Sequence, residues 1–394
     1  MKTAEVKELY KNYVLGNYAP EQLCIVKGKG SRVWDIEGKE YLDFFPGWAV
    51  CALGHCHPDV VSALRYQAGQ LIHLPNNYMN LRQAQLAKVI SEYSFPAKVF
   101  FCNSGAEANE AAIKFARRYG NPKGKYEIIS MLNSFHGRTL ATATATGQTK
   151  YQQGFEPLPV GFKYATFNDL TSLKAAITEK TIAVLLEPVQ GEGGVNIASK
   201  TYMQGIRKLC DEKGLLMILD EVQTGIGRTG KMFAFQHYGI EPDLMTLAKS
   251  LGGGAPIGAL VVNNKLENVL VPGTHASTFG GNPLVTRAAL SVFKTIKDKK
   301  LLAHVEKMSA YVSEKLEVFK QKFPVIKELR ICGLMIGIEL TCEGRKYVEG
   351  CIARRLLINC THGNVLRIIP AMIVTKKEVD KALSILEEVF KELS

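Results

Sequence analysis

The sequence lacks several features that would place it in a class at once. None of its 394 residues lies in an uncharged apolar run long enough to cross a bilayer, so we expect no membrane-spanning helix. The first eight residues are polar and contain no apolar signal core, which favours a cytoplasmic protein. Internal repeats and low-complexity stretches are also missing, which argues against repeat architectures.

Cysteine occurs nine times but never as Cys-x-x-Cys, and an odd number argues against a full set of disulfides. Most of the nine lie in apolar runs, as expected of buried free thiols in a reducing compartment. His55 and His57 flank Cys56, yet adjacent residues cannot easily surround one ion, and no second cluster supplies further ligands. We therefore expect a turn leading into a helix here, and no metal.

Acidic residues are the minority among the charged ones, 37 against 49 lysines and arginines, which gives a formal net charge of +12. A basic excess is one property of nucleic-acid-binding proteins. The lysines are spread along the chain, however, and neither a recognition module nor a basic stretch interleaved with aromatics is visible. We interpret the charge as a solvated surface that attracts anionic substrates, and expect no nucleic-acid partner.

What the chain does contain is an alternation of strand-like and helix-like segments. The strand-like segments are rich in Ile, Leu and Val without in–out alternation, as in strands covered on both faces. This alternation predicts an α/β fold with a mainly parallel sheet. The strand candidates are residues 98–102, 126–131, 182–186, 215–220, 244–247 and 257–262, separated by helical patterns at 106–119, 172–179 and 203–213.

The pattern changes near residue 282, where a smaller α+β unit begins. A strand–turn–strand pattern also occupies residues 22–44. The segments after residue 282 are helical patterns at 283–296 and 301–319, strands at 334–340 and 366–369, and an amphipathic helix at 376–393.

Two residues at strand ends indicate a pyridine cofactor. Lys249 lies among small and apolar residues, where a lysine can lose its proton and form a Schiff base with an aldehyde. Asp220 ends the strand-like run 215–220 and can hold the positive charge of a ring nitrogen. Together they supply what pyridoxal phosphate requires, although an ordinary strand-end aspartate is the alternative.

Ser104, Gly105 and Ala106 open the helical pattern at 106–119 and fit the phosphate of such a cofactor. Ser104 is a good N-cap, and free amides at a helix start favour an anion. An ordinary capped turn has the same pattern.

Two further segments carry polar groups that fit this site. Phe135 precedes His-Gly-Arg and could lie over a flat ring, while Arg138 could hold a carboxylate through two hydrogen bonds. Glu187 ends a strand-like run, and Glu192 lies in the glycine-rich loop that follows. A surface arginine and a solvated loop glutamate are the alternatives.

These segments together resemble the class III (ω-amino acid) aminotransferases. The match runs from about Tyr18 to the last helix, and includes His275-Ala-Ser-Thr-Phe-Gly-Gly-Asn-Pro and Val365-Leu-Arg-Ile-Ile-Pro. Residues 28–44 and 134–139 are most similar to the acetylornithine subgroup. The resemblance implies fold type I of the pyridoxal enzymes. In that fold a large domain at 46–282 holds a mainly parallel sheet, and a small α+β domain is built from 1–45 and 283–394.

The resemblance also implies a role for each matching residue. Lys249 would bind the cofactor and carry a proton, Asp220 would pair with the ring nitrogen, and Val222 and Phe135 would cover the two ring faces. Thr278 would reach the phosphate bound by the neighbouring subunit, which implies an obligate homodimer with shared active sites. The other implied cofactor contacts are Gln223 at the 3-hydroxyl group and Ser104, Gly105 and Ala106 at the phosphate.

Two substrates that enter one site in turn are implied, an ω-amino donor and 2-oxoglutarate. Arg367 matches the arginine that binds the α-carboxylate of 2-oxoglutarate, and Glu192 matches the glutamate that masks this buried charge from the donor. Arg138 would hold the distal carboxylate in both half-reactions, with Ser277 and Trp48 near the substrate. The implied reaction moves the δ-amino group of N2-acetyl-L-ornithine to 2-oxoglutarate. Its products are N-acetyl-L-glutamate 5-semialdehyde and L-glutamate, as in arginine biosynthesis.

Trp48, Cys51, Ser250 and the Pro370–Ala371 pair depart from the family's pattern, but none removes a catalytic group. Trp48 leaves the size of the donor open, and a core tryptophan at the dimer interface is the other interpretation. Ornithine, 4-aminobutyrate and succinyl-diaminopimelate are alternative donors. An enzyme similar to glutamate-1-semialdehyde aminomutase would need no 2-oxoglutarate, and a nucleic-acid-binding protein would be colourless and bind in a salt-dependent way.

Overall fold

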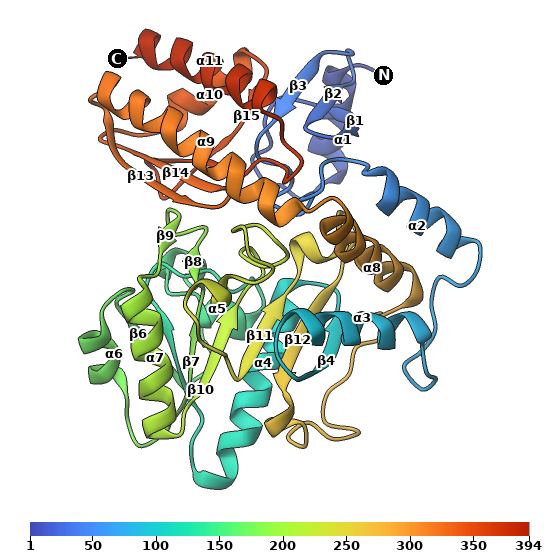
Figure 1. The fold of residues 1–394 in the computed structure, drawn as a ribbon, viewed down its shortest axis with the longest axis vertical. Coiled ribbons are helices and arrows are strands. Elements are labelled where there is room, and N and C mark those ends of the chain that lie inside the picture. Colours follow the sequence, from blue (N-terminus) through green and yellow to red (C-terminus); the bar gives the residue numbers. More distant parts are fainter. Residues whose placement is uncertain (394) are drawn as a thin grey trace.

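A seven-stranded sheet forms the centre of the larger of two units in the computed structural model, which describes residues 1–393 (Figure 1). Its order is β4–β12–β11–β10–β7–β5–β6, and β12 runs antiparallel to both neighbours while the other pairs are parallel. The strands are β4 (Ala97–Cys102), β5 (Glu127–Met131), β6 (Phe162–Ala165), β7 (Thr181–Leu186), β10 (Leu216–Asp220), β11 (Leu244–Leu247) and β12 (Gly258–Asn263). The prediction of a mainly parallel sheet is confirmed, and β6 at its edge is the strand that the pattern missed.

Both faces of this sheet are covered, because consecutive residues of a strand point to opposite sides. Ile128 of β5 belongs to the apolar cluster that includes Phe115 of α4, whereas Ile129 belongs to the cluster that includes Met203 of α7. This arrangement explains why the strands read as continuous apolar runs. The covering helices are α4 (Gly105–Gly120) on one face and α3 (Leu81–Tyr93), α7 (Lys200–Lys213) and α8 (Pro283–Asp298) on the other.

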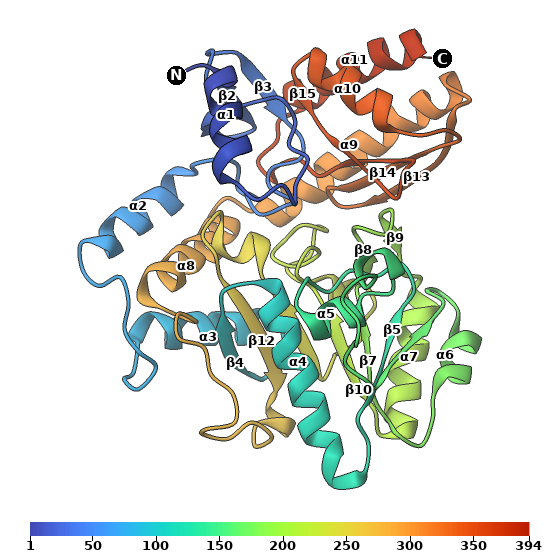
Figure 2. The same ribbon diagram turned by 180° about the vertical axis from the view of Figure 1, so that it is seen from behind.

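Both ends of the chain build the smaller unit, whose blue and red segments lie side by side in Figures 1 and 2. Strand β15 (Leu356–Leu357) pairs in parallel with β3 (Glu40–Asp43), which joins the amino-terminal sheet to the carboxyl-terminal part. A second sheet, of order β13–β14–β17–β16, lies beside it. The remaining elements are β1 (Ile25–Lys29), β2 (Arg32–Asp35), β13 (Ile326–Cys332), β14 (Met335–Leu340), β16 (Asn359–Thr361), β17 (Val365–Ile368), α9 (Leu301–Lys322), α10 (Arg345–Ala353) and α11 (Lys376–Leu393).

Residues 22–44 form three strands rather than the two of the predicted strand–turn–strand pattern. The additional turn lies at Gly30, whose φ of 59° is in the left-handed region that glycine tolerates. The second turn, between β2 and β3, contains Gly38. The domain limits at 45 and 282 remain a prediction.

The two histidines beside Cys56 have local partners. His57 Nδ1 accepts the amide of Asp59 at 3.3 Å and caps α2 (Pro58–Ala68), while His55 Nε2 lies 2.7 Å from Asp43 Oδ2. Among residues 1–393, no group of three or more His, Cys, Asp and Glu side chains could hold a metal ion.

Short elements complete the fold. No helix of the described chain is long and apolar enough to span a membrane. The additional helices are α1 (Thr3–Tyr13), α5 (Leu140–Ala145) and α6 (Leu170–Ala176), and β8 (Val189–Gln190) pairs with β9 (Asn196–Ile197).

Candidate active site

The parallel strands of the large sheet place their carboxyl ends at one edge, and the predicted site residues follow these ends. A cavity of about 440 Å³ lies there. Open α/β sheets bind ligands at this edge because the loops that follow the strands converge on it. Eleven residues singled out from sequence line the cavity: Ser104, Gly105, Ala106, Phe135, Arg138, Glu187, Glu192, Asp220, Val222, Gln223 and Lys249.

Four other predicted residues do not line this cavity in the single chain. Arg367 is fully buried behind Glu192. Ser277 Oγ accepts hydrogen bonds from Asn103 Nδ2 at 3.3 Å and from an amide of its own loop, and Thr278 is exposed. Trp48 is 51% exposed and packs edge-on against Phe45, with ring centroids 5.5 Å apart. The roles of these four residues, like the roles of the residues that line the cavity, stay predictions.

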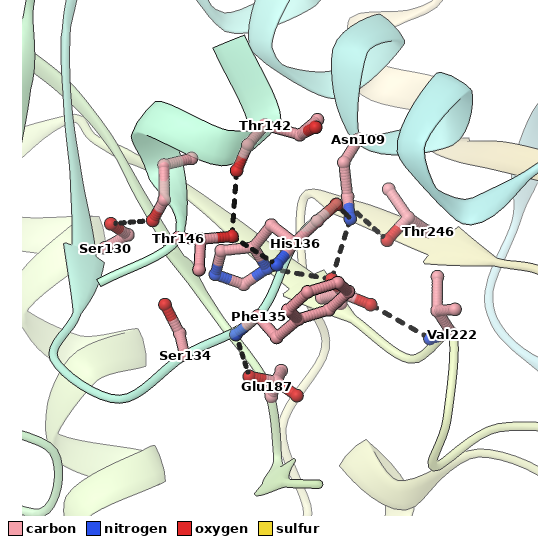
Figure 3. A network of polar contacts seen from close by, with 12 residues as sticks. Asn109, Ser130, Ser134, Phe135, His136, Thr142, Thr146, Glu187, Val222 and Thr246 are labelled. Carbon is pink, nitrogen blue, oxygen red and sulfur yellow. Dashed lines mark hydrogen bonds and ion pairs between the residues drawn. The ribbon is translucent and has the colours of Figure 1, made fainter. Parts of the chain in front are cut away.

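A hydrogen-bond network fixes the carboxylate of Asp220 at the end of β10. Figure 3 labels its partners Asn109, His136 and Val222. Oδ2 accepts from Asn109 Nδ2 at 2.7 Å and from His136 Nδ1 at 2.8 Å, and Oδ1 accepts from the amide of Val222 at 3.0 Å. Thr246 Oγ1 in turn donates a hydrogen bond to Asn109 Oδ1 at 2.8 Å. Four separate segments therefore orient one anion.

Sequence reasoning missed the partners of Asp220. Asn109 is buried in α4, in the middle of an otherwise apolar face, and a buried amide requires a partner. That signal could have identified it. His136 and Thr246 had no such signal, because strand order decides what they face.

Lys249 follows β11 and begins a short 3-10 helix, Lys249–Gly252, with φ of 43°. A residue other than glycine in this left-handed region is strained, and such strain is concentrated at functional sites. Burial lowers the pKa of the ammonium group, although the charges of Glu192 and Asp220 oppose the shift. A lower pKa increases the fraction of free amine that can react with a carbonyl.

The cavity fits a flat phosphorylated ring. A Cβ atom at Gly105 would lie 2.8 Å from Val222 Cγ1, so only glycine lets the start of α4 pack directly against Val222. The amides of Gly105 and Ala106 have no acceptor in the described chain and are free for an anion, while Ser104 Oγ caps the amide of Glu107 at 3.1 Å.

The side-chain oxygen of Gln223 supports the same ligand. Gln223 Oε1 is buried and has no hydrogen-bond partner among residues 1–393. An unpaired buried acceptor is costly, so a ligand hydroxyl that donates to it would be stabilised. Pyridoxal phosphate carries such a hydroxyl beside its aldehyde, and the residues present therefore fit this cofactor.

Glu187 supports the loop that carries Phe135. Its Oε2 accepts the amide of Phe135 at 2.9 Å and its Oε1 accepts the amide of Gly191 at 3.3 Å. Burial raises the pKa of this carboxyl to about 7, against the opposing charge of His136. Sequence reasoning placed Glu187 only at a strand end, so its supporting contact is new.

Glu192 and Arg367 form an ion pair between the two units. Arg367 Nη1 lies 2.6 Å from Glu192 Oε1, and Arg367 Nε donates to Asn359 Oδ1 at 3.0 Å. Burial would raise the pKa of Glu192, but the charge and the hydrogen bond of Arg367, together with the charges of Lys249 and Lys150, outweigh burial, and the pKa is lowered. Arg367 Nη2 is buried without a partner, so one donor remains for a second anion.

The chain is similar to aminotransferases over its full length. A family model described as aminotransferase class-III matches residues 14–390. The sequence is 51% identical over 395 residues to the acetylornithine aminotransferase of Methanocaldococcus jannaschii, with 98% of each chain covered. The structure of an ornithine aminotransferase from Toxoplasma gondii matches with a TM-score of 0.95 at 34% identity, covering 100% of this chain and 96% of that one. An acetylornithine aminotransferase from Elizabethkingia anophelis matches with a TM-score of 0.89 at 30% identity, covering 100% of both.

Proposed function

This chain belongs to the class III aminotransferases, and from that premise we propose that it moves the δ-amino group of N2-acetyl-L-ornithine to 2-oxoglutarate. N-Acetyl-L-glutamate 5-semialdehyde and L-glutamate are the products. The observation that carries the proposal is the Glu192–Arg367 pair beside Lys249, because it suits one site to two differently charged substrates. The similarity to the Methanocaldococcus enzyme supports the identity of the donor.

The family depends on pyridoxal phosphate, which supplies an aldehyde that exchanges amines and a ring that accepts electrons. Asp220, whose carboxylate is held by Asn109 and His136, would pair with the ring nitrogen. Phe135 and Val222 line the cavity and would cover the two faces of the ring, and the first amides of α4 would hold the phosphate. Lys249 lines the same cavity, and its Nζ would hold the cofactor and carry the proton that leaves the δ-carbon of the donor.

Glu192 and Arg367 would select between the half-reactions. With the amine donor bound, Glu192 neutralises Arg367, so the donor's apolar chain does not lie against an unpaired charge. When 2-oxoglutarate enters, its α-carboxylate replaces that of Glu192 and also takes the unpaired Nη2. Arg138, which lines the cavity at its exposed side, would anchor the distal carboxylate of either substrate.

A spectral half-reaction screen tests the donor. The pyridoxal form is mixed with single amines, and its loss of absorbance is followed without an acceptor. N2-Acetyl-L-ornithine should react with the highest specificity constant, ahead of ornithine, 4-aminobutyrate and N-succinyl-diaminopimelate. Arg138 would bind its carboxylate, and its acetylated α-nitrogen carries no charge. Equal or faster reaction with free ornithine or 4-aminobutyrate would reject this donor. Turnover without 2-oxoglutarate would instead favour an aminomutase.

We also propose that the working form is a homodimer with shared sites. Helix α1 buries none of its residues, and Tyr13, Leu15, Met79 and Phe279 are all more than 60% exposed. Apolar exposure of this extent is unusual in a monomer. The exposed Thr278 is then free to reach the partner's phosphate. Sedimentation should give twice the mass of one chain, whereas an active species with the mass of one chain contradicts the proposal.

A reducing compartment is the proposed location. All nine cysteines are free thiols, and Cys102, Cys210 and Cys351 are buried. Such a set is typical of cytoplasmic proteins. Labelling of the thiols in freshly lysed cells should find all nine reduced, and native disulfides would contradict this location.

A further inference from the structure

Arg138 is held at the cavity by aromatic rings rather than by hydrogen bonds. Its guanidinium carbon lies 4.1 Å from the ring centroid of Tyr151 and 5.5 Å from that of Phe135. In the described chain, its side chain makes no hydrogen bond or ion pair with another residue. All five N–H donors therefore remain free for a substrate carboxylate.

The ring of Tyr151 is itself fixed in place. Tyr151 ends a short 3-10 turn, Thr149–Tyr151, between two glutamines whose side chains bind the backbone. Gln148 Nε2 donates to the carbonyl of Ser134 at 2.9 Å, and Gln152 Nε2 donates to the carbonyl of Thr146 at 2.9 Å. The turn is thereby anchored to the loop that carries Phe135.

Tyr151 also contacts the residue that covers the cofactor ring. The rings of Phe135 and Tyr151 meet edge to face, with centroids 5.6 Å apart and planes at 85°. The ring of Tyr151 therefore touches both Phe135, the proposed cover of the cofactor ring, and Arg138, the proposed anchor of the carboxylate. Through these two contacts, Tyr151 would fix the position of a bound carboxylate relative to the cofactor ring.

We propose that Tyr151 is a positioning residue for Arg138: its ring holds the guanidinium by a cation–π contact, so that the carboxylate end of both substrates is bound in line with the reacting carbon. The inference rests on the proposed function, because it assumes that Arg138 binds a substrate carboxylate. A free arginine samples many rotamers, and a hydrogen-bonded partner would occupy its donors. An aromatic face restrains the group without using those donors.

The test separates the ring of Tyr151 from its hydroxyl group. The hydroxyl makes no hydrogen bond within residues 1–393, so Tyr151→Phe should leave both KM values within about twofold of the original. Tyr151→Leu removes the aromatic face and should raise KM for N2-acetyl-L-ornithine and for 2-oxoglutarate about two- to fivefold, with kcat nearly unchanged. Similar thermal midpoints for the two variants would show that folding is intact.

A donor without the carboxylate makes the readout specific. N-Acetyl-1,4-diaminobutane has the same reacting amine, so Tyr151→Leu should leave its half-reaction unchanged. An equal loss with both donors, or the same loss in Tyr151→Phe, would overturn the inference. If Arg138→Ala raises KM for the carboxylated donor and Tyr151→Leu does not, only the inference about Tyr151 fails. If Arg138→Ala changes KM equally for both donors, the proposal that Arg138 anchors the carboxylate fails, and the inference about Tyr151 fails with it.

Discussion

Replacing Lys249 with alanine should reduce transamination by at least about 10⁴-fold, because in the proposed function this one side chain both binds the cofactor and carries the proton. Lys249 has a lowered pKa from burial and lies in the cavity with Asp220 and Glu192. Among residues 1–393, no other lysine lines that cavity, and water is a poorer, unpositioned base. The specificity constant for N2-acetyl-L-ornithine with 2-oxoglutarate measures the loss.

Colour provides a second readout for the same variant. The original protein should be yellow and bleach with borohydride, whereas Lys249→Ala should lose the covalent link and the bleaching. Lys265→Ala is the matched control, because Lys265 is an exposed lysine on the surface and should change neither property. Full activity in Lys249→Ala, or a colourless original protein, would reject a pyridoxal enzyme. A colourless protein with salt-dependent binding to DNA would favour the nucleic-acid alternative.

Replacing Arg367 with alanine should affect the two half-reactions unequally. The 2-oxoglutarate half-reaction should lose about 10²- to 10³-fold in kcat/KM, as expected when one member of a buried charge pair is removed. The α-carboxylate would lose its partner, and Glu192 would be left half-buried without its ion pair. The kcat/KM of the donor half-reaction should fall much less, since in the proposed mechanism the donor does not use Arg367. Single-turnover absorbance measurements resolve the two.

Glu192→Gln is the complementary variant for this pair. An amide keeps the shape and an acceptor oxygen but removes the charge that neutralises Arg367. The kcat/KM of the donor half-reaction should therefore fall, while 2-oxoglutarate should bind as tightly as before or more tightly. Equal losses in both half-reactions for Arg367→Ala and Glu192→Gln would contradict the switch and indicate a structural ion pair.

Much of the fold could be predicted from local patterns. The strand β10, the helix α11 and the glycine-rich segment after β7 each depend on residues that are close in sequence. The cofactor pair, Lys249 and Asp220, was also readable, because each follows an apolar strand and parallel strands end at the same edge. The short edge strand β6 was missed, since its four residues are mostly half-buried and their pattern is weak.

Contacts between distant segments could not be predicted in the same way. His136 reaches Asp220 across 84 residues, and Asn109 reaches it across 111. These contacts arise because the order of strands in the sheet differs from their order in the chain. The supporting role of Glu187 and the ring of Tyr151 beneath Arg138 have the same origin.

The sequence by itself determined the class of elements and the mainly parallel sheet, and it predicted Lys249 and Asp220 as a cofactor pair, because periodicity and strand-end residues are local properties. Only the tertiary structure decided which of these groups meet. It placed Glu192 against Arg367 across 175 residues and left Trp48 half-exposed outside the cavity. It also left the donors of Arg138 free beside two aromatic rings. The physical reason is that packing of the sheet and of the two units brings together side chains that no local pattern relates.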